Sequence, residues 1–365
     1  MTDRELLLDP GPEGSVDADE LVRAAMEWHF SPDTGSPYWL ARAKEFGFDP
    51  RAEVTTVADL RLFADVPIDW TVVPAGQLIP RGCLGRGDQF WVHESGGATG
   101  APKRIVDATS RAGAVRWQSR MLDEQGFPSG EGGWLHIGPS GPHIMAKNVR
   151  NLAHLRGFLC NYVDLDPRWV RRCLAEGRRE DFQRYVGHVF DQVRDVVASQ
   201  DIRAVSSTPR MLELLTARTD ILPRLRETVR GVIWGGTSAD GETLRLLQEE
   251  VFPEAAVRGV YGNTMMGIAP QRSAEPDDQA VCVFRPFHPY SIVELVDPEN
   301  PERAVDVDEE GRVRVTVLTR DFFAPPTLER DLAIRRASAP GWAGIELSHV
   351  RPFEAAGAKV IEGVY

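Results

Sequence analysis

Between residues 89 and 261, short strand-like segments alternate with longer segments of helical periodicity. Because helices separate consecutive strands, the strands are expected to lie parallel, with helices on both faces of the sheet. This alternation is the strongest constraint on the fold and predicts an α/β core. The predicted strands are 89–93, 133–137, 204–207, 231–235 and 256–261, and the predicted helices are 109–125, 180–199, 209–218 and 240–251.

The regions on either side of this core have different patterns. Residues 18–63 indicate short helices, one opened by Ser36 and one capped by Thr56. From residue 279 onward the apolar residues alternate, which predicts a smaller antiparallel β unit. Its predicted strands are 281–284, 291–296 and 312–318, followed by a proline-containing loop at 323–326. We therefore predict a helical leader over 1–70, an α/β core over 71–275 and a β-rich subdomain over 276–365.

Charge and hydropathy exclude several classes of function. A net charge of −12 argues against a nucleic-acid surface, which needs a basic face. No apolar run is long enough to cross a membrane, and the first five residues lack the basic start of a signal peptide. We expect a cytoplasmic protein with no nucleic-acid or membrane partner.

A glycine-rich segment, Ser-Gly-Gly-Ala-Thr-Gly-Ala-Pro-Lys, begins at Ser95 and ends at Lys103. Glycines allow close backbone approach to an anion, hydroxyl groups add donors, and the lysine adds a charge. Ala101 and Pro102 separate Gly100 from the lysine, so this is not a Walker A loop. A plain glycine turn with a chance lysine is the alternative. The chain contains only four lysines, which favours a phosphate-binding loop.

The spacing of this loop resembles the phosphate loop of the adenylate-forming superfamily, which includes acyl-CoA synthetases, peptide-synthetase adenylation domains and luciferases. The resemblance implies an α/β nucleotide- and acid-binding core that uses ATP and releases pyrophosphate. It assigns ATP binding to Ser95, Gly97, Thr99 and Gly100, and a catalytic charge on the β- and γ-phosphates to Lys103.

A second segment, Tyr-Gly-Asn-Thr-Met at residues 261–265, resembles the superfamily's Tyr-Gly-x-Thr-Glu motif. The resemblance implies that the Tyr261 ring stacks on adenine, with Gly262 and Asn263 beside it, and that the Thr264 hydroxyl contacts the α-phosphate as a catalytic group. Met265 replaces the glutamate that helps to hold magnesium, and a thioether does not bind a hard cation. ATP or AMP is therefore the implied ligand, and Mg²⁺ use stays open.

Further nucleotide contacts are implied at three other places. The turn at Gly235, Gly236 and Thr237 corresponds to the superfamily's glycine turn on the other face of adenine. Asp331 stands where a Thr-Gly-Asp motif supplies the carboxylate that accepts hydrogen bonds from the ribose hydroxyls. Arg351 is a candidate for a second ribose or phosphate contact.

Within the superfamily, the leader is similar to that of the phenylacetate-CoA ligase branch, through the segments 36–39, 45–50 and 57–60. In that branch a histidine lies beside the acyl pocket, which assigns this catalytic place to His143. Other candidates for the pocket are Trp134, His136, Met145, Met211 and Met266, although residues of these types are also common in a core.

Full-length members of the superfamily continue into a mobile domain of roughly a hundred residues, a usual domain size. The sequence given ends at Tyr365, so the resemblance implies a truncated member that forms acyl-adenylate slowly and no CoA thioester. Such a chain resembles the adenylating proteins of phenazine antibiotic biosynthesis. This resemblance implies activation of an aromatic carboxylate, here a phenazine carboxylate, for a downstream reductase or acyl acceptor.

Two other functions stay open at this point. The first is a degenerate protein that binds a nucleotide or an aromatic acid without turnover, which the change at Met265 favours. The second is a complete acyl-CoA ligase.

Overall fold

The computed structural model describes residues 3–9, 16–64, 66, 68–95, 101–108, 111–278 and 281–353. The chain divides into two compact units, each assembled from separate segments. The first unit comprises Met1–Trp117, Asn263–Ile268 and Arg285–Leu347, and the second comprises Gln118–Gly262, Ala269–Phe284 and Ser348–Tyr365. The boundaries at 70 and 275 stay predictions.

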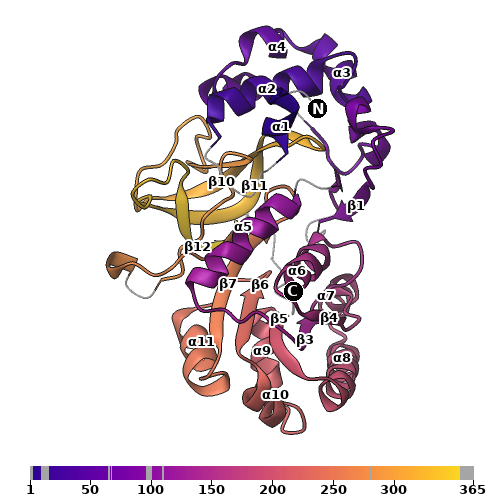
Figure 1. Cartoon of the computed structure of the whole chain (residues 1–365), viewed down its shortest axis with the longest axis vertical. Coiled ribbons are helices and arrows are strands. Elements are labelled where there is room, and N and C mark those ends of the chain that lie inside the picture. Colours follow the sequence, from indigo (N-terminus) through magenta and orange to yellow (C-terminus); the bar gives the residue numbers. More distant parts are fainter. Residues whose placement is uncertain are drawn as a thin grey trace. The chain divides into compact units, whose positions relative to one another are not determined.

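A six-stranded sheet organises the second unit, in the order β4-β3-β5-β6-β7-β8. The strands from β4 to β7 pair in parallel, and their order can be followed in Figure 1. Every residue of β3 and β6 is buried, as expected for parallel strands covered on both faces. The strands are β3 (Gly133–Ile137), β4 (Leu159–Tyr162), β5 (Ile202–Ser207), β6 (Gly231–Gly235), β7 (Ala256–Asn263) and β8 (Gly267–Pro270).

Helices connect the consecutive strands from β3 to β7, which confirms the predicted α/β alternation. Several begin at a capping side chain: Thr208, for example, accepts a hydrogen bond from the Met211 amide at 3.3 Å, with a proline at the first helical position. The helices are α5 (Arg111–Glu124), α6 (Ile144–Leu155), α7 (Pro167–Ala175), α8 (Arg179–Ser199), α9 (Pro209–Thr216), α10 (Leu222–Thr228) and α11 (Gly241–Arg245), the last continued by a π-helical turn over Leu246–Val251.

The first unit begins with short helices that pack on an aromatic cluster. The ring of Phe323, on a strand far along the chain, lies 5.0 Å from that of Trp39 and 5.5 Å from that of Phe63. Ser36 and Thr56 cap their helices as predicted. The helices are α1 (Asp3–Leu8), α2 (Ala18–Phe30), α3 (Pro37–Arg42) and α4 (Pro50–Glu53), with 3₁₀ turns at Ala43–Glu45, Val57–Phe63, Ala75–Leu78 and Arg81–Cys83.

One predicted strand belongs to a different sheet from the one expected. The segment predicted at 89–93 forms β1 (Trp91–Glu94), which pairs antiparallel with β2 (Arg104–Asp107) in a two-stranded sheet. The prediction of a parallel βαβ strand at this place is therefore wrong. The strand is followed directly by a second strand, so a hairpin can form without a crossover helix.

A four-stranded sheet has the order β12-β11-β10-β9, and the antiparallel pairing of β9, β10 and β11 confirms the predicted antiparallel unit. The predicted strand at 281–284 is wrong, since it contributes only the bridge between Phe284 and Gln271. The loop predicted at 323–326 is also wrong, because these residues begin a long strand. The strands are β9 (Ser291–Val296), β10 (Glu310–Leu318), β11 (Phe323–Arg336) and β12 (Glu346–Pro352).

Two register shifts let β11 run through residues that disfavour a strand. Pro325 and Pro326 fall between the pairs of Thr327 and Ala324 with β10, where no ladder hydrogen bond is required of them. A second shift lies between Leu328 and Leu332 and contains the segment that the sequence assigned to ribose binding. Bulges of this kind re-aim side chains and are frequent beside functional sites.

Candidate active site

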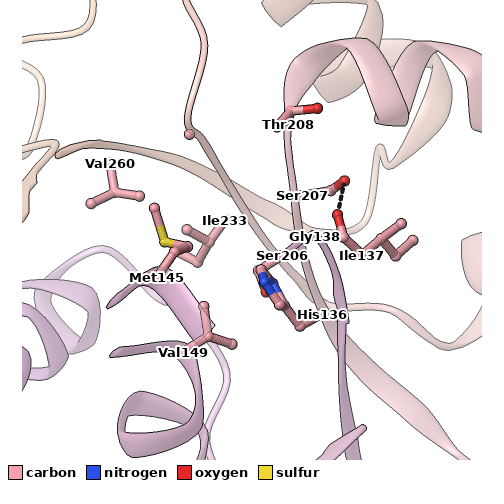
Figure 2. A pocket seen from close by; sticks show the side chains of 11 residues that line it. His136, Ile137, Gly138, Met145, Val149, Ser206, Ser207, Thr208, Ile233 and Val260 are labelled. Atoms are coloured by element: carbon pink, nitrogen blue, oxygen red, sulfur yellow. Dashed lines mark hydrogen bonds between the residues drawn. The ribbon is translucent and has the colours of Figure 1, made fainter. Parts of the chain in front are cut away.

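A pocket in the second unit lies where β3, β5 and β6 end. Its cavity volume is about 20 Å³, room for about one water molecule. Figure 2 shows Met145, Val149, Ile233 and Val260 grouped together, away from His136. The lining residues are His136, Ile137, Gly138, Met145, Val149, Ser206, Ser207, Thr208, Ile233, Gly235 and Val260.

His136 is one of the buried polar side chains that the parallel sheet brings to this pocket. It pairs in register with Ser206 of β5, and its Nδ1 lies 2.9 Å from the Ser206 hydroxyl oxygen. The indole N–H of Trp134 donates to the same hydroxyl at 3.0 Å. Burial lowers the pKa of His136 to about 4, so the ring is neutral near pH 7.

The glycine turn after β6 shares Gly235 with the pocket. A Cβ on Gly235 would lie 2.5 Å from the Val260 carbonyl oxygen, so the neighbouring strand allows no side chain here. Gly236 has a φ of +83°, which also favours glycine. Thr237 follows on this turn.

The predicted adenine motif lies at the end of β7. The Tyr261 side chain is buried, and its ring lies 6.3 Å from that of Phe284. Gly262 and Asn263 end the strand, and the Asn263 carboxamide oxygen accepts a hydrogen bond from the Met266 amide at 2.7 Å.

The chain after this motif is anchored within the first unit. The Arg111 guanidinium donates to the carbonyl oxygens of Thr264 and Met265, at 3.0 and 2.8 Å. The Met265 side chain is buried and apolar. A thioether does not suit a hard cation, so the residue present does not fit the magnesium role of the corresponding glutamate.

Only part of the glycine-rich loop falls within the described residues. Gly97, Thr99 and Gly100 lie outside them. At the base of the loop, the Ser95 amide donates to the Lys103 carbonyl at 2.9 Å, and the Lys103 amide donates to the Ser95 hydroxyl at 2.9 Å. These bonds fix where the Lys103 side chain leaves the hairpin.

Lys103 forms an ion pair that its sequence motif does not predict. Its ammonium lies 2.9 and 3.1 Å from the two carboxylate oxygens of Glu329, on the bulged part of β11. Burial raises the pKa of Glu329, and the charge of Lys103 opposes this shift. Asp331 is two residues further along the same bulge, so the first unit brings the loop lysine close to the predicted ribose segment.

Two other predicted residues have more peripheral positions. His143 is buried at the residue that precedes α6, but it does not line the pocket. Arg351 is exposed on β12. Of the further pocket candidates, Met145 lines the pocket, Trp134 bonds to Ser206, and neither Met211 nor Met266 contributes to the lining.

Sequence reasoning missed the role of Glu329 and gave His136 no specific role. A signal for His136 was present, because a histidine within the buried strand 133–137 needs a polar partner. Ser206 occupies the matching place near the end of the next parallel strand. The contact of Glu329 could not be found this way, since it depends on a register shift in β11.

Among the described residues, no helix is both long and apolar enough to cross a bilayer. In the same part of the chain, the His, Cys, Asp and Glu side chains form no group of three or more that could hold a metal ion.

The fold is that of the large domain of adenylate-forming enzymes. A structure of 2-hydroxyisobutyryl-CoA ligase with 2-HIB-AMP and CoA is 14% identical, with a TM-score of 0.58, and the match covers 92% of this chain and 67% of that one. The post-adenylation state of the ligase gives the same identity and TM-score over 88% of this chain and 63% of that one. ATP-bound MatB from Rhodopseudomonas palustris is 17% identical, with a TM-score of 0.45, over 71% of this chain and 47% of that one.

The chain thus spans about half to two thirds of the length of these solved structures. No family model and no curated protein matches the sequence.

Proposed function

We propose that this chain binds ATP and converts a carboxylic acid with an aromatic body into an acyl-adenylate. The observation that carries this proposal is the double role of Gly235, which lines the pocket and begins the glycine turn. In open α/β sheets, ligands bind outside the carboxyl ends of the strands. An acid in the pocket and an adenine on the turn would then be neighbours.

In the proposed reaction, a carboxylate oxygen of the acid attacks the α-phosphorus of ATP. The bond from that phosphorus to the bridging oxygen breaks, and pyrophosphate leaves. We assign neutralisation of the leaving charge to Lys103, and contact with the α-phosphate to Thr264. His143 is proposed to lie beside the carboxylate. Alignment and charge neutralisation account for most of such a rate enhancement.

The proposed nucleotide contacts follow the motif positions. Tyr261 and the turn at Gly235, Gly236 and Thr237 would hold the adenine, and Asp331 would accept hydrogen bonds from the ribose hydroxyls. Arg351 and the glycine-rich loop from Ser95 are proposed to contact phosphate.

The lining of the pocket supports an apolar acyl body. Met145, Val149, Ile233 and Val260 offer hydrocarbon and thioether surface, which suits a planar ring. A phenazine carboxylate is the specific acid that we propose to test first, with a downstream reductase or another acyl acceptor taking up the acyl-adenylate.

Binding without turnover is the second candidate function. The pairing of Lys103 with Glu329 favours it, since a lysine held by a carboxylate must release that partner before it can neutralise pyrophosphate.

Acid-dependent exchange of labelled pyrophosphate into ATP tests the first function against the second. We expect exchange with at least one aromatic carboxylate, and hydroxylamine should trap the product as a hydroxamate. Binding of ATP and acid without exchange would favour the second function.

A further inference from the structure

Arg111, the first residue of α5, holds the segment that carries Thr264. Its Nη2 group donates to the main-chain carbonyl oxygens of Thr264 and Met265, at 3.0 and 2.8 Å. Hydrogen bonds from a charged donor are stronger than those between neutral groups, which suits such a fixing role. Both acceptors are main-chain atoms, so these bonds fix the backbone of Thr264 without occupying its hydroxyl.

The guanidinium is itself held in place by its surroundings. Arg111 is only 9% exposed, and its Nε lies 3.8 Å from the buried carboxylate of Asp107, the last residue of β2. Burial lowers the pKa of Arg111, and the charges of Asp107 and Asp321 oppose this shift, so the group stays charged. A guanidinium this deeply buried, with its Nη2 bonded to carbonyl oxygens, is not placed to bind a phosphate itself.

The segment after Thr264 is shaped to admit this guanidinium. At Gly267 a Cβ atom would lie 2.7 Å from Nη1 of Arg111, and the φ of +92° also favours glycine. A second side chain holds the segment from β9, where the Ser291 hydroxyl donates to the Met266 carbonyl at 2.9 Å. The carbonyl oxygens of residues 264–266 are therefore all bonded to side chains of the first unit.

The stretch of chain that contains Arg111 also places Lys103. This lysine directly precedes β2, in which Ile105, Val106 and Asp107 are buried. Arg111 then joins this stretch to Thr264, a residue 153 positions further along the chain. One strand and the start of the next helix thus place both proposed phosphate contacts, Lys103 directly and Thr264 through Arg111.

We propose that Arg111 is a positioning residue for nucleotide binding, which places the Thr264 hydroxyl against the α-phosphate by holding the Thr264 main chain. Arg111 acts through Thr264 and does not touch the nucleotide. This inference rests on the proposed function for the contact between Thr264 and the α-phosphate. It does not require turnover, because AMP already contains that phosphate.

The first experiment compares AMP with adenosine, which lacks the α-phosphate. Calorimetry gives the affinity of the full chain for each, and their ratio reports the phosphate contacts alone. Arg111→Lys keeps a charge beside Asp107 but loses the planar guanidinium that reaches both carbonyl oxygens. We expect the ratio of AMP to adenosine affinity to fall about fivefold, the effect of losing one hydrogen bond, with adenosine affinity unchanged.

The matched control is Arg120→Lys, at an exposed arginine on the same helix, which should leave the ratio unchanged. An unchanged ratio in a folded Arg111→Lys variant would overturn the proposal. So would an equal loss of both affinities, which is the result that a purely structural role predicts.

Thr264→Val tests whether Arg111 acts through this residue. Thr264 is only half-buried, so the variant should fold, and the ratio should fall by a similar factor. The combined variant Arg111→Lys/Thr264→Val should lose little more than Thr264→Val alone, because two changes to one contact are not additive. Additive losses would contradict the assignment. A full ratio in Thr264→Val would also contradict it, whether or not Arg111→Lys folds.

Pyrophosphate exchange separates this inference from turnover. A fall of the ratio in Arg111→Lys, together with a wild-type chain that shows no exchange, would support the positioning role and contradict catalysis. Exchange by the wild-type chain, together with an unchanged ratio in Arg111→Lys, would support the reaction and overturn the positioning role.

Discussion

The lysine of the glycine-rich loop and the histidine of the pocket are both polar groups at proposed binding sites, but they differ in what they contact. The Lys103 ammonium is paired with both carboxylate oxygens of Glu329, at 2.9 and 3.1 Å. The buried His136 ring contacts neutral groups instead, with the Ser206 hydroxyl 2.9 Å from Nδ1 and a backbone hydrogen bond at Pro139. A phosphate that reaches Lys103 must compete with a carboxylate, whereas these partners of His136 carry no charge.

This difference teaches that the two sites respond to ligands in different ways. Competition from Glu329 weakens the ground-state binding of an anion to Lys103. A strongly charged group, such as pyrophosphate as it leaves, can displace Glu329 and then receive the full charge of the lysine. The His136 ring is buried and neutral, and its partners are already in place in the unliganded protein. The charged pair at Lys103 is therefore the contact that a phosphate would have to rearrange.

The largest expected effect is that of Lys103→Met. Loss of one preorganised charge at a developing anion reduces turnover by about 100- to 1,000-fold, so we expect pyrophosphate exchange to fall by this factor while AMP affinity stays nearly unchanged. The double variant Lys103→Met/Glu329→Gln shows whether an unpaired Glu329 causes the loss. Lys44→Met is the matched control on an exposed lysine. Full exchange activity in the Lys103→Met variant would mean that Lys103 has a structural role instead of a catalytic one.

Asp331→Ala should weaken AMP binding by about 1–3 kcal/mol, because a charged acceptor for the ribose hydroxyls is lost. Calorimetry with AMP measures this directly. Asp331→Asn, which keeps one acceptor oxygen, should lie between the variant and the wild type. Unchanged affinity in both variants would remove the ribose assignment.

The buried histidines predict how stability depends on pH. His136 and His29 have pKa values near 4 in the folded chain, against about 6.5 when exposed, and burial is the main cause for both. Below pH 6.5 the unfolded chain binds more protons, so the free energy of unfolding falls as the pH drops toward 4.

Each histidine should account for a loss of about 2 kcal/mol between pH 7 and pH 5. Urea unfolding at both pH values measures the loss, and His136→Gln should reduce it by that share. The Nε2 of His29 is bonded to the Thr319 carbonyl at 2.7 Å, so His29→Gln serves as the comparison at a histidine whose donor is occupied. An unchanged pH dependence in His136→Gln would contradict a buried neutral ring.

The smallest expected effect is that of Glu329→Gln. Removing the competing carboxylate should tighten ATP binding by about fivefold, since a partly exposed ion pair contributes up to about 1 kcal/mol. AMP, which lacks the β- and γ-phosphates, should bind as before and serves as the control ligand. Weaker ATP binding in this variant would mean that Glu329 positions Lys103 for the phosphates.

The sequence predicts the core of the fold well and the edges of the site poorly. The strands at 133–137 and 231–235 are observed with the predicted bounds, because fully buried parallel strands have continuous apolar sequences. The start of strand β11 was not predicted, because Pro325 and Pro326 indicate a loop. The register shift that accommodates these prolines is visible only in the pairing of β11 with β10.

The same limit applies to the candidate site. Motif order is enough to single out Lys103 and Tyr261, because their chemistry is carried by local spacing. The contact with Glu329 joins residues 226 positions apart, and the contact between His136 and Ser206 depends on the register of two parallel strands. Whether a polar group is satisfied is a property of the folded chain, so residue type alone cannot indicate it.

Gly138 is where the chain leaves β3 in contact with the His136 ring. A methyl group at this position would lie 2.6 Å from the Cε1 atom of His136 and would force the ring to turn. A glycine-to-alanine change needs only one nucleotide substitution, so a small mutational step is enough to disturb the wall of this pocket.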